Sequence, residues 1–185
     1  MSDSEHGKRL HEIEDLSAFL IAYERETGAP LRSVDSGESP DFICARPNGR
    51  RIGVELTKVY VSCYIERRIG LGSYYRYVLG LDPITGYDIA DKVSARAYLK
   101  TEKVRSGVWR LKTNILVLQT YDLPLSEIAP ALDDLAADIA TSSAFREIWV
   151  ADFCDASPFR EIDLYCIRPT HFRGYHPGPW QKPIT

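Results

Sequence analysis

Hydrophobic positions recur along this chain with two different periods, and each period predicts a different kind of element. Apolar residues spaced three or four apart over residues 8–26 and 88–104 predict amphipathic helices. A third helical pattern covers residues 124–140 and opens on a proline, which suits the first turn of a helix. Continuous apolar runs at residues 114–121 and 147–153 predict strands that are covered on both faces.

Two weaker strand patterns lie at residues 31–35 and 162–167, and the second is expected at the edge of the sheet. Residues 60–87 mix tyrosine, arginine and glycine without a steady period, which predicts an insertion. Four prolines after residue 168 predict an irregular tail over residues 169–185. The predicted fold is therefore α/β, an α+β sandwich in which helices flank a mixed central sheet.

The first helix carries two acidic residues close to its predicted apolar arc. At 100° per residue, this arc contains six apolar side chains, namely Leu10, Ile13, Leu16, Leu20, Ile21 and Tyr23. Glu24 falls inside the arc and Glu14 lies at its edge. A carboxylate among apolar positions needs a partner or a route to water, so each either reaches solvent or leans over a polar site.

The clearest two-residue period lies on both sides of the turn Pro47-Asn48-Gly49, which predicts a β-hairpin. A two-residue turn would place Asp41 and Glu55 on opposite faces, whereas a three-residue loop with Gly49 in the left-handed conformation pairs them directly. The longer loop also gathers the apolar residues of the hairpin on one face, namely Phe42, Cys44, Ile52, Val54 and Leu56. We therefore predict the three-residue loop.

A directly opposed pair of carboxylates is unfavourable unless a cation accompanies it. Asp41 and Glu55 would repel each other and raise each other's proton affinity. Hard divalent cations such as Mg²⁺ relieve this repulsion, because they take carboxylate oxygens and keep several waters. The alternative from the strand pattern alone is an ordinary hairpin whose polar face lies in water.

The segment Pro40-Asp41, followed after thirteen residues by Glu55 within Ile-Gly-Val-Glu-Leu-Thr, resembles the PD-(D/E)xK nuclease superfamily. It is most similar to variants in which threonine, here Thr57, replaces the lysine two places after the glutamate. The resemblance implies an αβββαβ restriction-endonuclease-like core over roughly residues 10–153. It also implies that Asp41 and Glu55 bind Mg²⁺ or Mn²⁺ for the hydrolysis of phosphodiester bonds.

The same resemblance suggests where the remaining parts of such a site would come from. A first-helix glutamate, Glu14 or Glu24, would supplement the metal ligands. The missing lysine would be replaced by Lys58, if the strand bulges, or by a lysine of the helix at residues 88–104. Lys100 lies within the apolar arc of that helix, where a lysine is costly unless it meets an anion, and Lys92 lies just outside the arc.

Composition and length bound these hypotheses. The 185 residues fit a single domain, and 44% hydrophobic with 26% charged residues is ordinary for a globular protein. The four cysteines have no metal-ligand spacing, and neither a signal peptide nor a membrane span is recognisable. We therefore expect buried thiols in a reducing cytoplasm and no membrane partner.

Local charge is more informative than the net charge of −3. Residues 92–112 hold seven basic residues against one acid, whereas residues 122–163 hold ten acids against two arginines. This polarity predicts a nucleic-acid-binding surface on the basic helix, DNA being the first candidate. The side chains expected to hold the phosphate backbone are Lys92, Arg96, Lys103 and Arg105.

Three functions remain open at this point. The first is a metal-dependent endonuclease-like hydrolase, with catalysis assigned to Asp41, Glu55 and one of Lys58 and Lys100. The second is a non-catalytic nucleic-acid or protein binding module that keeps the nuclease fold. The third is an immunity-type partner protein whose acidic half binds a basic surface, and a homodimer is compatible with each of them.

Overall fold

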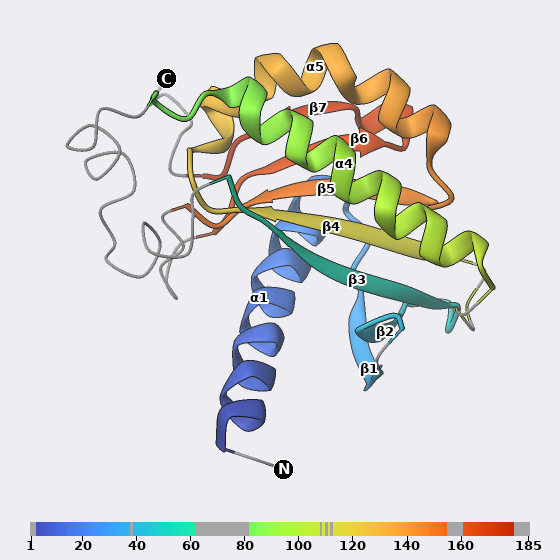
Figure 1. The fold of residues 1–185 in the computed structure, drawn as a ribbon. Coiled ribbons are helices and arrows are strands. Elements are labelled where there is room, and N and C mark those ends of the chain that lie inside the picture. Colours follow the sequence, from blue (N-terminus) through green and yellow to red (C-terminus); the bar gives the residue numbers. More distant parts are fainter. Residues whose placement is uncertain are drawn as a thin grey trace.

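The described part of the protein forms one seven-stranded mixed sheet with helices on both faces (Figure 1). The computed structural model describes residues 3–37, 39–61, 82–107, 109, 111, 113–154 and 161–179. The helices are α1 (Asp3–Thr27), α4 (Gly86–Arg105), α5 (Leu125–Ser142) and the short 3₁₀ helix η1 (Thr170–Phe172). The strands are β1 (Arg32–Ser36), β2 (Phe42–Ala45), β3 (Arg51–Val59), β4 (Asn114–Thr120), β5 (Glu147–Asp152), β6 (Leu164–Arg168) and β7 (Gly174–His176).

The strands lie in the sheet in the order in which they occur in the chain, from β1 to β7. The pairs β1–β2, β2–β3, β5–β6 and β6–β7 are antiparallel, whereas β3–β4 and β4–β5 are parallel. The connecting helices α4 and α5 cover one face of the central strands and α1 covers the other, so every residue of β4 is buried. The predicted α/β class and the predicted order of helices and strands are confirmed through β5.

The sheet separates two apolar cores. On one face, α4 and α5 pack against side chains of β4 and β5 such as Leu116, Leu118 and Val150. On the other face, α1 packs against the alternate side chains, among them Ile115, Val117 and Trp149. Figure 1 shows α1 crossing this second face and α4 and α5 lying together on the first. A side chain on β3 can therefore meet either α4 or α1, depending on its position in the strand.

The hairpin between β2 and β3 has the predicted register. Phe42 pairs with Val54 and Cys44 with Ile52, and all four side chains are buried in the core beneath α1. The loop has three residues, and Gly49 adopts the left-handed conformation with φ of 77°. This residue also closes the loop, because its amide donates a hydrogen bond to the Arg46 carbonyl at 2.8 Å. Asp41 thus lies opposite Glu55, one position beyond the last paired residues.

The predicted apolar arc of α1 is wrong in its rotation. Leu16, Phe19 and Tyr23 are buried, but Leu10, Ile13 and Ile21 are each about half exposed. The buried side of the helix is partly polar at its N-terminal end, where it meets charged and backbone groups of the hairpin instead of an apolar surface. Because this part of the buried side is polar, the spacing of hydrophobic residues does not reveal it.

The predictions for the end of the chain need a second correction. The expected irregular tail over residues 169–185 begins instead with η1 and then β7, which pairs with β6, so β6 is not the edge strand. A three-residue strand that begins at Gly174 has too few residues to show a period of two. Residues 62–81 of the predicted insertion at 60–87 lie outside the described residues, and 86–87 already belong to α4.

Two smaller expectations can be checked on the described residues. Cys44 and Cys166 are buried free thiols, as expected, and Cys154 is partly exposed. No helix in the described part of the chain has the length and hydropathy needed to cross a membrane.

Candidate functional site

Two carboxylates converge where β2 and β3 separate. The Asp41 amide donates a hydrogen bond to the Glu55 carboxylate at 3.3 Å, and an Asp41 carboxylate oxygen accepts one from the Leu56 amide at 2.8 Å. Glu55 lies on the face of β3 that α4 covers, and only 4% of it is exposed. The predicted meeting of Asp41 and Glu55 on one side of the hairpin is therefore confirmed.

Gly53 permits this approach. A Cβ atom built on Gly53 would lie 2.6 Å from Cγ of Pro40 and would also collide with the Asn114 side chain. The Pro40 ring therefore rests directly on the backbone of β3, and this contact brings the adjoining Asp41 to Glu55. A glycine inside a strand commonly marks such a close approach.

The environment of Asp41 disfavours its charged form. Burial raises the pKa of this carboxyl to about 6, and the neighbouring charges of Glu55 and Glu12 act in the same direction. The hydrogen bond from the Leu56 amide and the charge of Lys100 oppose that rise in the pKa. A carboxyl whose pKa lies close to neutrality in a polar cluster is a common feature of functional sites.

Lys100 completes the cluster from α4. Its ammonium group forms an ion pair and hydrogen bond with Glu55, and both side chains are largely shielded from solvent. Ile89, Ala90, Val93 and Ala97 of α4 are buried, as predicted, so Lys100 extends from the same side of the helix into the sheet. The prediction that Lys100 lies beside these carboxylates is confirmed, whereas Lys92 is exposed.

The two residues after Leu56 point to opposite faces of β3. Thr57, at the position of the lysine in the resembled motif, is buried, and its hydroxyl has no hydrogen-bond partner among the described residues. Lys58 faces α1, where its ammonium lies 3.5 Å from the Asp15 carboxylate and 5.6 Å from the ring centre of Tyr121. Lys58 is thus held away from the carboxylate pair by a different partner.

The first-helix glutamates proposed as further ligands are not the ones that the fold supplies. Glu14 is 74% exposed and pairs with His11, and Glu24 is exposed near the end of α1. Glu12 instead lies close enough to Asp41 to raise its pKa, and it is held by Arg9 at 3.0 Å. Glu12 precedes Leu16 by one helical turn, but only the fold shows that Leu16 lies on the buried side of α1, so the hydrophobic pattern did not single out Glu12.

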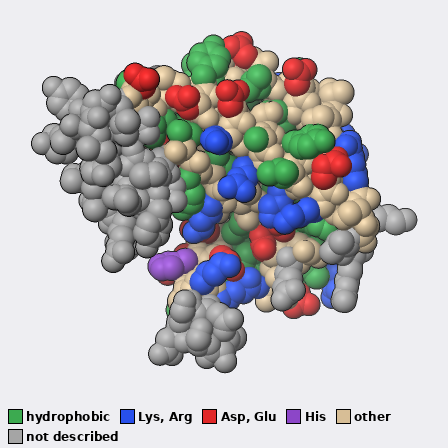
Figure 2. Space-filling view, viewed as in Figure 1, with side chains coloured by type: hydrophobic (Ala, Val, Ile, Leu, Met, Phe, Trp, Pro, Cys, Tyr) green, Lys and Arg blue, Asp and Glu red, His purple; other side chains and the backbone are tan. Residues whose placement is uncertain are grey.

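The basic residues of α4 lie on the same side of the molecule as this cluster. Lys92, Arg96, Lys103 and Arg105 are all exposed. A hollow of about 450 Å³ is lined by Arg96, Leu99, Lys100, Glu102, Lys103 and Ser106, so Lys100 borders both the hollow and Glu55. Figure 2 shows Lys and Arg side chains gathered across the middle of this face, with acidic side chains toward its upper edge.

Arg105 is the least available of these cations. Its guanidinium pairs with Glu102 at 2.9 Å and donates to the Ser142 carbonyl at the end of α5 at 2.9 Å. Arg96 and Lys103 have no ion-pair partner among the residues that the structure describes. These two therefore fit the expected role, binding of the phosphate backbone of nucleic acid, better than Arg105 does.

Comparison with protein-family models, curated proteins and solved structures finds no match to this chain. The chemistry of the site must therefore be inferred from its own geometry.

Proposed function

We propose that this chain is a PD-(D/E)xK-like nuclease domain that hydrolyses phosphodiester bonds of nucleic acid with Mg²⁺ or Mn²⁺. The observation that carries the proposal is the cluster formed by Asp41, Glu55 and Lys100, because it unites two opposed carboxylates with one ammonium group. The succession α1-β1-β2-β3-α4-β4 supports the finer assignment of a restriction-endonuclease-like core.

The residues present fit a hard divalent cation. Mg²⁺ is usually bound by one or two carboxylates and keeps several waters, and Asp41 and Glu55 supply two converging carboxylates. The unpartnered hydroxyl of Thr57 leaves a buried polar atom here to be satisfied, and the raised pKa of Asp41 means that burial and the charge of Glu55 outweigh the groups that would stabilise its charge. Among the described residues, no three Asp, Glu, His or Cys side chains are close enough to form a full protein cage, so waters would complete the coordination.

Each residue then has a distinct role. Asp41 and Glu55 would hold the cation, which supplies acidification of a water and neutralisation of the charge that develops on the phosphate. Lys100 would orient the attacking water from α4 and assist the transfer of its proton. Glu12 would tune the site through the charge that it presents to Asp41.

The substrate would lie along α4. Arg96 and Lys103 border the hollow that leads to Lys100, and their charges suit contacts with phosphates that are independent of base sequence. The acidic side chains elsewhere on the molecule would repel the same backbone, which would restrict nucleic acid to this face.

The proposal is tested by a cleavage assay with labelled single-stranded and double-stranded DNA and RNA in Mg²⁺, Mn²⁺ or EDTA. We expect cleavage with either metal, none in EDTA, and none by Asp41→Asn in any buffer. Glu14→Gln is the matched control, because it removes an exposed carboxylate of α1 and should leave cleavage unchanged. Cleavage that survives both EDTA and Asp41→Asn would refute the assignment of this site.

One observation favours a second candidate, a binding module that keeps the fold without catalysis. The Lys100 ammonium already pairs with Glu55, so the charge of that carboxylate is compensated without a metal. Calorimetric titration with Mn²⁺ separates the two candidates. A nuclease should bind Mn²⁺ and lose that binding in Asp41→Asn, whereas a non-catalytic module should bind nucleic acid but not Mn²⁺.

A further inference from the structure

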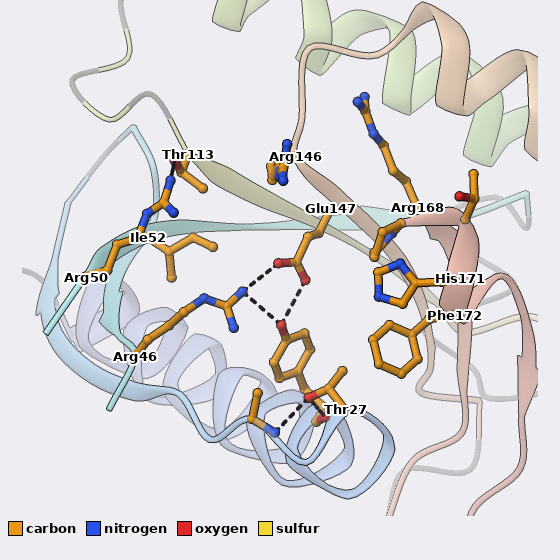
Figure 3. A pocket seen from close by; sticks show the side chains of 14 residues that line it. Thr27, Arg46, Arg50, Ile52, Thr113, Arg146, Glu147, Arg168, His171 and Phe172 are labelled. Atoms are coloured by element: carbon orange, nitrogen blue, oxygen red, sulfur yellow. Dashed lines mark hydrogen bonds and ion pairs between the residues drawn. The ribbon is translucent and has the colours of Figure 1, made fainter. Parts of the chain in front are cut away.

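A second cavity lies on the opposite face of the sheet from Glu55. It has a volume of about 600 Å³ and opens where β2 ends and where β3 and β5 begin, beside the C-terminal end of α1. Its lining includes Arg46, Arg50, Arg146, Arg168, His171 and Phe172 (Figure 3). A volume of this size falls within the range of small-molecule sites, which is about 300–1,000 Å³.

One buried charge pair forms the floor of this cavity. The Glu147 carboxylate, 10% exposed, accepts hydrogen bonds from Arg46 at 2.6 Å and from the Tyr23 hydroxyl at 2.9 Å. Arg46 also donates to the Tyr23 hydroxyl at 3.2 Å, so the three groups form a closed network. Among the described residues of the lining, the only carboxylate is therefore already neutralised by one of the four guanidinium groups.

The other three guanidinium groups leave the cavity strongly basic. Arg50 donates to the neutral hydroxyl of Thr113 at 3.2 Å, and Arg168 donates to backbone carbonyls in the last turn of α5 and just after it, the nearest at 3.1 Å. Arg146 is exposed at the rim. None of these three forms an ion pair with a described residue, and the concentration of positive charge stands out in a protein of net charge −3. A guanidinium group recognises phosphate through paired hydrogen bonds.

An aromatic wall faces this charge. His171 and Phe172 lie on the side of the cavity opposite Arg46 and Arg50 (Figure 3). Their ring centres are 4.6 Å apart, and Phe172 is anchored on Trp149 at 6.3 Å between ring centres. Such a wall offers stacking surface to a flat ring, which a free phosphate or a short dicarboxylate would not use.

We propose that this cavity binds a nucleoside monophosphate, with its phosphate at Arg50 and Arg146 and its base against His171 and Phe172. The volume, the excess of guanidinium groups and the opposed aromatic wall together specify a ligand that is anionic at one end and flat at the other. The site is separate from the proposed nuclease centre, because Glu147 and Glu55 project from opposite faces of the sheet. The test of nucleotide binding at this cavity therefore does not depend on nuclease activity.

Isothermal titration of the full chain tests the proposal, with AMP, UMP, ribose 5-phosphate and inorganic phosphate as probes. EDTA in the buffer removes any contribution from a metal at Asp41. We expect saturable binding of AMP and UMP that is at least 10-fold tighter than binding of inorganic phosphate. Arg50→Ala and Arg146→Ala should each weaken it by about 10- to 100-fold, the usual range for lost hydrogen bonds to a charged group.

The variants are chosen so that folding does not confuse the result. Arg50 and Arg146 are exposed, so their removal should leave the thermal midpoint of unfolding unchanged. Arg32→Ala is the matched control, because it removes an exposed arginine of β1 that does not line the cavity and should not alter binding. His171→Ala should weaken the binding of AMP and leave the binding of ribose 5-phosphate unchanged, because only AMP has a base to stack on the ring.

Two results would overturn the proposal. Equal binding of AMP, ribose 5-phosphate and inorganic phosphate would exclude a nucleotide as the ligand class. Absence of nucleotide binding, or binding that Arg32→Ala weakens as much as Arg146→Ala does, would exclude this cavity as the location.

Discussion

The ammonium group of Lys100 on α4 meets the carboxylate of Glu55 on β3, although the two residues are 45 positions apart in the chain. This contact places a cation beside two opposed carboxylates in a strand pair whose own lysine position is occupied by Thr57. On the other face of the same strand, Lys58 is engaged by Asp15. Of the lysines proposed for catalysis, only Lys100 therefore reaches the carboxylates.

This arrangement predicts different effects for two lysine substitutions. If the chain cleaves nucleic acid, Lys100→Ala should reduce the cleavage rate by roughly 10²- to 10⁴-fold, which is typical for one positioned proton-transfer group. Lys58→Ala should change the rate much less, because its ammonium faces α1. Both variants are compared on one labelled substrate under single-turnover conditions. Full activity of Lys100→Ala together with loss in Lys58→Ala would contradict the roles assigned here.

The raised pKa of Asp41 predicts a pH-dependent cost to the stability of the metal-free protein. Its pKa is about 6 in the folded chain against 3.8 without the fold, so the folded state binds the proton more tightly. The contribution of Asp41 to the free energy of unfolding must then fall as pH rises from about 4 to about 6, and stay low above pH 6. The full cost is at most about 3 kcal/mol.

Urea unfolding of wild type and Asp41→Asn, in EDTA and across this pH range, measures that cost. Asparagine carries no charge and can still accept the hydrogen bond from the Leu56 amide. We therefore expect the variant to gain stability over wild type as pH rises from 4 to 6, with a constant difference above pH 6. Glu14→Gln should show no such trend. A difference independent of pH would mean that Asp41 ionises as it does in the unfolded chain.

The exposed cations of α4 predict a salt-dependent interaction with nucleic acid. Arg96→Glu with Lys103→Glu should weaken binding and flatten the dependence of the binding constant on salt concentration, because fewer phosphate contacts release fewer counterions. Fluorescence anisotropy with a labelled oligonucleotide measures both quantities over a salt series. Arg32→Glu, an exposed reversal on β1, is the control. An unchanged salt slope in the double variant would place the binding surface elsewhere.

The hairpin and the helix lysine were predictable because local rules specify them. The turn Pro47-Asn48-Gly49 determines the register between β2 and β3, and that register brings Asp41 to Glu55. Lys100 was identified by the conflict between its charge and the apolar arc around it. In both cases, a short stretch of sequence and one physical rule were sufficient.

The contribution of α1 was not predictable in the same way. Its N-terminal half meets the hairpin through Arg9, Glu12 and Asp15, whose partners become neighbours only after folding. The hydrophobic pattern therefore selected Glu14 in place of Glu12. The cavity of the second site was invisible for the same reason, because Arg46 and Glu147 are 101 residues apart.

Gly53 supports the sharpest structural prediction, because the position of Asp41 depends on it. A methyl group at Gly53 would overlap the Pro40 ring on one side and the Asn114 side chain on the other, and Asn114 is 3% exposed. Overpacking of a tight site typically costs about 1–3 kcal/mol.

We expect Gly53→Ala to lower the free energy of unfolding by this amount, and to weaken Mn²⁺ binding because Pro40 and Asp41 must move away from Glu55. Gly28→Ala, at the exposed left-handed end of α1, is the control: strain should destabilise it too, without any effect on Mn²⁺ affinity. Equal Mn²⁺ affinity in both variants would show that Asp41 does not depend on the contact between Pro40 and Gly53.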